Sequence, residues 1–222
     1  MNASEALYRL RRLGSPVVSN GEAATVWGLS ESATTHALLR LAEAGLVQRV
    51  RHGLWAVDRD VDPLQVAPAL TRPYPCYGST WTALARHGLI DQIPAATFVV
   101  SLDRAQSIPT SFGTIVIQHI HPALYGGFAN SEGVALATPE KALFDTVYLL
   151  AARGAARISL PEITLGTTFD RADAEAWVER APSKSLRTLT RRYLARVLDA
   201  AEREGTVPTH RFPTRGVSDI IR

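Results

Sequence analysis

Apolar residues recur at helical spacing through the first part of the chain. On this pattern we predict three helices, over residues 4–13, 21–27 and 30–44. Ser30 suits the N-cap of the third helix, and Gly45 suits the left-handed position that closes it. Two short apolar-rich runs, 46–51 and 54–57, flank a tight turn at His52-Gly53 and predict a hairpin. The order helix, helix, helix, hairpin is that of a winged helix-turn-helix.

The rest of the chain mixes strand and helix patterns. Strands are predicted over 97–102 and 112–120, which are rich in β-branched residues, and helices over 79–87, 138–153, 171–181 and 184–204. We therefore expect an α+β chain with a winged helix-turn-helix at 1–60, a proline-rich connector at 61–75, and a mixed α/β domain at 76–222 that ends in helices. Few contacts are expected to cross the connector, so the two units should be separable.

The third helix predicts a surface that reads DNA. A recognition helix buries one face and presents the other to the major groove, with its N-terminal residues nearest the base edges. Its predicted outer face offers hydroxyl, imidazole and guanidinium groups, which bond to bases or phosphates. The hairpin would add basic side chains that grip the adjacent backbone. The expected DNA contacts are Ser32, Thr35, His36, Arg40, Arg49, Arg51 and His52.

Composition adds little to this picture, and the distribution of charge adds more. The formal net charge is only +3, which by itself argues weakly for a nucleic-acid partner. The excess of positive charge lies after residue 182, on the last predicted helix and the tail that follows it. The single cysteine excludes an internal disulfide, and the chain has no apolar run long enough to cross a bilayer. A reducing cytoplasm is the compartment that fits these features.

Two stretches of the second half resemble a known family. Residues 77–94, YGSTWTALARHGLIDQIP, resemble the S-x-x-x-A-L-x-x-H-G-L-x-x-Q-x-P stretch of AbiEi-type antitoxins. Residues 137–145, ATPEKALFD, are similar to the A-x-P-E-K-A-L-x-D helix start of the same family. The predicted winged helix-turn-helix precedes them, as it does in that family.

The resemblance implies an antitoxin of a type IV toxin–antitoxin pair that also represses transcription. In such proteins the winged helix binds repeats in the operon's own promoter, and the second domain supports neutralisation of a nucleotidyltransferase-like toxin. The resemblance implies no catalytic residue and no cofactor in the antitoxin. A ligand-responsive winged-helix repressor without a toxin partner is the alternative, and a catalytic second domain is a third hypothesis.

The last helix carries the candidate partner contacts. Arg192, Arg196 and Arg203 lie on one face of it, either as a surface that binds an acidic partner or DNA, or as a solvated helix face. In the motif at 137–145, Lys141 and Asp145 are spaced to pair across one helical turn, which is worth a few tenths of a kcal/mol if the pair is exposed. We expect these motif residues to determine the fold more than to contact partners.

Enzyme hypotheses find weak support in the sequence. Ser79, His87 and Asp91 are the residue types of a hydrolase triad, but Ser79 lacks the strand–turn–helix motif that exposes such a nucleophile. His119 and His121 alternate as two metal ligands on a strand would, with no third ligand at a suitable spacing. Cys76 has no activating base nearby in the sequence and suits a packing role. We therefore expect no catalytic residue and no metal site.

Overall fold

The N-terminal helices form where apolar spacing and capping residues predict them. In the computed structural model, which describes residues 2–58, 60–154 and 160–205, these helices are α1 (Ala3–Arg11), α2 (Asn20–Trp27) and α3 (Glu31–Glu43). Ser19 caps α2 and Ser30 caps α3, since each side chain accepts a hydrogen bond from a first-turn backbone N–H. Gly28 ends α2 with φ +65°, a left-handed conformation that lets α3 start three residues later at a new angle.

A small antiparallel sheet completes the first unit. Its strands are β1 (Val17–Ser19), β2 (Gln48–Arg51) and β3 (Leu54–Ala56), in the order β1-β3-β2. The hairpin of β2 and β3 turns at His52-Gly53, as predicted. Strand β1 was not predicted, because three residues are too few to show an alternating pattern. Residues 2–58 thus form a winged helix-turn-helix, and the mixed α+β class of the chain is confirmed.

The second unit is built on a six-stranded mixed sheet. Its strands are β4 (Cys76–Gly78), β5 (Thr97–Ser101), β6 (Gln106–Thr110), β7 (Gly113–His119), β8 (Phe128–Ser131) and β9 (Val134–Ala137). Their order is β6-β7-β5-β4-β9-β8, in which β4–β9 and β5–β7 are parallel and the other pairs antiparallel. The remaining elements are α5 (Thr80–Arg86), the 3₁₀ turn η1 (Pro122–Leu124), α6 (Pro139–Ala152), α7 (Arg171–Glu179) and α8 (Lys184–Gly205).

The segment predicted as a connector carries a helix, α4 (Pro63–Thr71). Asp62 caps it in a capping box with Gln65, and Pro63 occupies the first turn, where the missing N–H costs nothing. Pro68 lies inside the helix, which is why the proline-rich stretch did not look helical. Leu64, Val66 and Ala67 of α4 are buried in a core that α4 shares with the small sheet. The segment is therefore a packed helix and not an open linker.

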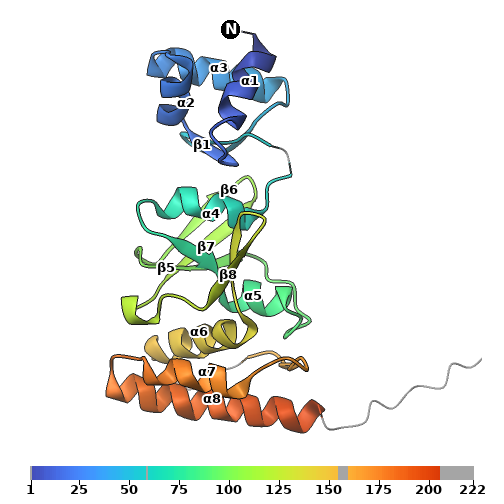
Figure 1. The fold of residues 1–222 in the computed structure, drawn as a ribbon, viewed down its shortest axis with the longest axis vertical. Coiled ribbons are helices and arrows are strands. Elements are labelled where there is room, and N and C mark those ends of the chain that lie inside the picture. The colour runs from blue at the N-terminus through green and yellow to red at the C-terminus, as the bar shows by residue number, and fades with distance from the viewer. Residues whose placement is uncertain (1, 59, 155–159, 206–222) are drawn as a thin grey trace, which may run out of the picture.

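The layers stack along the long axis of the molecule (Figure 1). Helices α1–α3 form one end, followed by the three-stranded sheet, α4, the six-stranded sheet, α5 and α6, and finally α7 and α8 at the other end. The small sheet is buried on both faces. Val18 and Trp55 pack against α1–α3, whereas Val17, Val50 and Ala56 share a core with α4 and with the strands of the large sheet. The other face of the large sheet packs against α5–α8.

Candidate nucleic-acid interface

Helix α3 is oriented largely as its pattern predicts. Thr34, Leu38 and Leu41 are buried against the other helices. Ser32, His36 and Arg40 are exposed, so three of the predicted contacts point away from the core. Leu39 lies among them with 39% of its surface exposed, an apolar group suited to contact with a sugar or a thymine methyl.

Thr35 differs from its neighbours because its hydroxyl is already engaged. It is half-buried, its Oγ1 donates to the carbonyl of Glu31 at 3.0 Å, and it accepts from Asn20 Nδ2 at 3.0 Å. The hydroxyl therefore holds α3 against α2 and retains one lone pair for any further partner.

Asn20, which sequence reasoning missed, joins the wing to the recognition helix. Its side chain donates to Thr35 and accepts from Trp55 Nε1 at 2.7 Å, while its backbone N–H donates to the carbonyl of Gly53 at 3.0 Å. One side chain thus connects α2, α3 and the hairpin. Asn20 directly precedes the helix predicted over 21–27, and nothing in the local sequence distinguishes this role from that of an ordinary residue at the start of a helix.

The wing carries its basic residues around a bulge. The pairing of β2 with β3 shifts register between Arg49 and Arg51, which places Val50 in the core and leaves both arginines exposed. The guanidinium of Arg49 stands 5.8 Å from the centre of the Trp55 ring, and its Nη2 lies 3.1 Å from Nδ1 of His52. Arg49, Arg51 and His52 therefore form one exposed basic group at the turn.

The wing also rests on the second unit. The carbonyl of Val50 accepts a hydrogen bond from the backbone N–H of Ser111, in the turn between β6 and β7, at 3.1 Å. Arg72, directly after α4, forms an ion pair with Glu22 of α2 at 2.7 Å. Partial burial acts to raise the pKa of Glu22, but hydrogen bonds from Ser19 and the charge of Arg72 outweigh it and lower that pKa. The second unit thus contacts the hairpin at Val50, between the two arginines, and contacts α2 at Glu22.

A buried polar cluster lies in the second unit, on the motif at 137–145. Lys141 and Asp145 form an ion pair, and both side chains are completely inaccessible to solvent. Asp145 also accepts from Tyr77 at 3.0 Å and from Ser79 at 2.7 Å, and Lys141 donates to Tyr77 at 2.9 Å. The ammonium stands 4.7 Å from the centre of the Trp177 ring. The few tenths of a kcal/mol expected for an exposed pair therefore do not apply.

Burial dominates the electrostatics of this cluster. Desolvation raises the pKa of Asp145 and lowers that of Lys141, and the attraction between the two opposes both shifts. Desolvation and the nearby Asp145 carboxylate also raise the pKa of Tyr77 far above its usual range. Every polar atom of the cluster has a partner within it, and the cluster joins β4, the start of α5 and α6. This arrangement agrees with the expectation that these motif residues determine the fold.

The residues considered for a hydrolase triad, a reactive cysteine and a metal site make other contacts in the structure. The Ser79 hydroxyl is buried against Asp145, whereas His87 Nε2 lies 2.7 Å from the carbonyl of Ala137. Burial raises the pKa of the Cys76 thiol, which disfavours the reactive thiolate. His119 ends β7 and His121 caps η1. Over the described ranges, no group of three His, Cys, Asp or Glu side chains is placed to hold a metal ion.

The candidate partner residues of α8 lie at the end of the molecule opposite α3 (Figure 1). Arg192 and Arg196 are exposed, and the Arg192 guanidinium stands 5.2 Å from the centre of the Tyr193 ring. Arg203 Nε donates to the carbonyl of Asp199 at 2.9 Å. Asp199 and Glu202 of the same helix pair with Arg171 of α7. Acidic residues thus interrupt the basic face.

Comparison with known families gives a match in the first unit. Residues 5–57 match the family model described as transcriptional regulator, AbiEi antitoxin. The match coincides with the winged helix-turn-helix and confirms the resemblance for this unit; the motifs at 77–94 and 137–145 lie outside it. No curated protein matches the chain. Along the described residues, no helix has the length and apolar character needed to span a membrane.

Proposed function

We propose that this chain is an antitoxin that neutralises a nucleotidyltransferase-like toxin and represses its own operon by binding promoter repeats. One observation carries the proposal: the match to AbiEi antitoxin regulators covers the same residues as the winged helix-turn-helix. The chain acts in this proposal by binding DNA and a toxin, without catalysis or a cofactor.

In the DNA complex, α3 enters the major groove and the wing contacts the neighbouring backbone. His36, Ser32 and Arg40 face the bases and the flanking phosphates, and Thr35 mainly orients the helix. Arg49 and Arg51 neutralise phosphates next to the groove, and His52 contacts the same part of the backbone. Each promoter repeat would receive one winged helix.

The toxin is engaged through the second unit, with Arg192, Arg196 and Arg203 as candidate contacts. Because α8 lies at the far end of the molecule from α3, one protein can present these arginines to a toxin while α3 occupies DNA. The competing function is that of a ligand-responsive repressor without a toxin partner. A protein with that function would not rescue the growth of cells that produce a toxin.

The DNA half of the proposal is tested by titrating the promoter at several salt concentrations. Replacing Arg49 and Arg51 by Ala should weaken binding to all sequences, and should reduce the slope of log affinity against log salt by about one for each phosphate that the wing no longer neutralises. The matched control replaces Arg104 and Arg153, which are exposed in the second unit. An unchanged affinity and slope in the folded wing variant would remove the wing from the interface.

The toxin half is tested by co-expression with the neighbouring open reading frame, scoring growth rescue and co-purification together. Reversing the charge of Arg192 and Arg196 to Glu should abolish rescue and leave promoter binding intact; the same reversal at Arg104 and Arg153 is the control. Rescue that survives together with a lower promoter affinity would assign α8 to DNA. A neighbouring gene whose product is harmless would favour the ligand-responsive repressor.

A further inference from the structure

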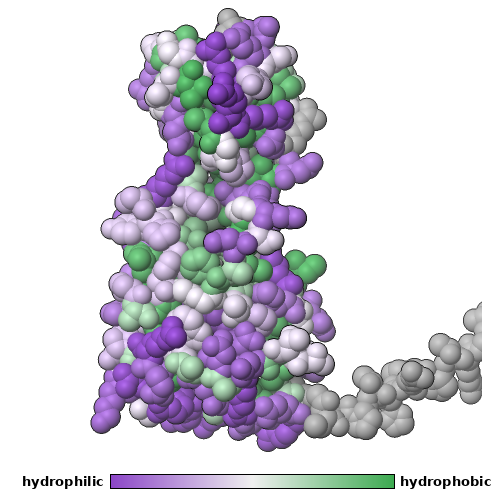
Figure 2. All heavy atoms as spheres, viewed as in Figure 1, coloured by the Kyte–Doolittle hydropathy of each residue, from purple (hydrophilic) through white to green (hydrophobic). Residues whose placement is uncertain are grey.

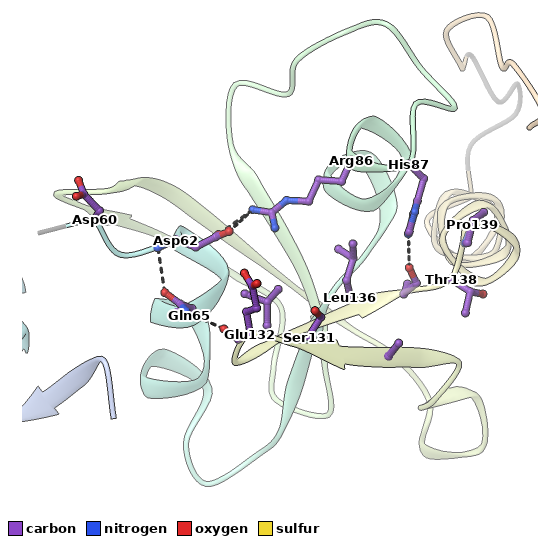
Figure 3. Close-up of a pocket in the computed structure, with 13 residues that line it drawn as sticks. Asp60, Asp62, Gln65, Arg86, His87, Ser131, Glu132, Leu136, Thr138 and Pro139 are labelled. Atoms are coloured by element: carbon purple, nitrogen blue, oxygen red, sulfur yellow. Dashed lines mark hydrogen bonds and ion pairs between the residues drawn. The ribbon is translucent and has the colours of Figure 1, made fainter. Parts of the chain in front are cut away.

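A hollow of about 610 Å³ opens on the second unit where the chain leaves the winged helix (Figure 3). Its walls are the start of α4, the end of α5 and one face of the β8–β9 hairpin. Val134, Leu136 and Pro139 are half-buried and line it with apolar surface. In the space-filling view, the outline of the molecule narrows at the junction of the two units (Figure 2). The connector enters α4 at the same level (Figure 1).

The rim of the hollow is acidic. Arg86 leans across one side and pairs with Asp62 at 2.7 Å, so its charge is neutralised within the rim. Asp60 and Glu132 are both exposed, and none of the ion pairs between described residues involves either of them. An occupant that complements this hollow therefore carries positive charge beside an apolar group.

Strand β8 adds a free sheet edge to the same place. It is the last strand in the order of the sheet, and Ala129, Asn130 and Ser131 are exposed. The two-residue turn at Glu132-Gly133 makes Ser131 and Val134 a hydrogen-bonded pair, so alternation directs the backbone N–H and C=O of Asn130 away from β9. An unpaired edge of this kind accepts an extended peptide as a further strand.

We propose that the free edge of β8 and the hollow together bind an extended, basic segment of a protein partner. The segment pairs with the backbone of Asn130. Its alternate side chains enter the hollow, where an apolar residue contacts Val134 and Leu136, and a Lys or Arg two positions away lies between Asp60 and Glu132. A second copy of this chain is a poor occupant, because pairing β8 with itself brings two acidic rims together. The site does not require that the partner be a toxin.

The test uses the full-length protein and a positional-scanning library of seven-residue peptides with blocked termini. We expect selection for Lys or Arg two positions from an apolar residue, and protection of the Asn130 amide from hydrogen exchange in the presence of the selected peptide. Replacing Asp60 and Glu132 by Lys should weaken binding about tenfold, as expected for two partly exposed charge pairs. The control replaces Asp91 and Glu162, which are exposed outside the hollow, by Lys.

Asn130→Pro tests the strand pairing directly. An edge strand tolerates proline where the N–H faces solvent, so the variant should fold and lose the peptide. Absence of any selected sequence would overturn the proposal. Two other results would also overturn it. One is that a folded Asn130→Pro protein selects the same peptides as the wild type, and the other is that the peptide does not change hydrogen exchange at the Asn130 amide of the wild type. Binding of small organic cations that survives Asn130→Pro would make the hollow a small-molecule site, and a dimer abolished by Asn130→Pro would assign the edge to self-association.

Discussion

Two neighbours on α3 show how differently adjacent side chains can contribute to recognition. The Thr35 hydroxyl bonds within the protein, whereas the His36 imidazole is exposed. His36→Ala should therefore narrow the difference in binding free energy between promoter and random DNA by about 1–3 kcal/mol, the usual worth of a base contact. Competition binding with both DNAs measures this difference. Equal losses on the two DNAs would mean that His36 contacts only phosphates.

The buried pair of Lys141 and Asp145 gives the sharpest prediction for stability. Lys141→Met leaves a carboxylate in the core without its cation, which should lower the free energy of unfolding by about 3–5 kcal/mol. The pKa of Asp145 is already raised by burial and should rise further without Lys141. A group whose folded pKa is raised stabilises the fold at low pH, so the stability of Lys141→Met should fall as pH rises through that pKa. Urea denaturation at several pH values measures both effects.

The control for this prediction adds Asp145→Asn to Lys141→Met. An amide still accepts a hydrogen bond from Tyr77 or Ser79 and carries no charge, so much of the lost stability should return and the added pH dependence should disappear. A double variant as unstable as Lys141→Met would show that the contacts of the ammonium with Tyr77 and Trp177, rather than the unpaired charge of Asp145, account for the lost stability.

At the scale of elements, the wing and the recognition helix form one rigid surface because Asn20 connects them. Asn20→Ala leaves the indole N–H of Trp55 without its acceptor, which should cost about 1–3 kcal/mol of stability. It should also weaken promoter binding more than the removal of a single phosphate contact would, because α3 and the wing lose their fixed spacing. Asn20→Asp keeps an acceptor for Trp55 and should recover most of the stability. Unchanged promoter affinity in Asn20→Ala would show that packing alone sets this spacing.

At the scale of the whole molecule, the two units share a hydrophobic core, so we expect them to fold together. Val17, Val50 and Ala56 of the small sheet are buried against α4 and the large sheet. Cutting the chain between residues 58 and 61 exposes this apolar surface on both fragments, so a fragment of residues 1–60 should be unstable or self-associate. The intact chain should unfold in one transition, with tryptophan fluorescence and far-UV circular dichroism giving the same midpoint.

Two separated transitions, or a folded monomeric fragment, would contradict this prediction. A fragment that begins near residue 70 is a poor choice for functional work, because it removes most of α4. Point variants therefore separate promoter binding from toxin neutralisation better than truncation does.

Local sequence determined the winged helix-turn-helix and the main helices. Helical spacing, the N-cap at Ser30, and glycines at helix ends act over a few residues, so they are visible without a structure. The outward positions of His36, Ser32 and Arg40 followed from helical geometry alone. The strands β1, β4, β6, β8 and β9 were missed. Four of them have only three or four residues and show no period, and β6 contains Pro109, a residue that argues against a strand.

Tertiary structure alone decided which polar residues are buried and which faces meet. The spacing of Lys141 and Asp145 is compatible with an exposed pair, and only the packing of β4, α5 and α7 around α6 removes it from water. The run of apolar residues in β3 gives no sign that its second face meets another unit. The acidic hollow likewise combines Asp60, Arg86 and Glu132 from three separate segments. Such arrangements depend on long-range contacts, which no local pattern of residues encodes.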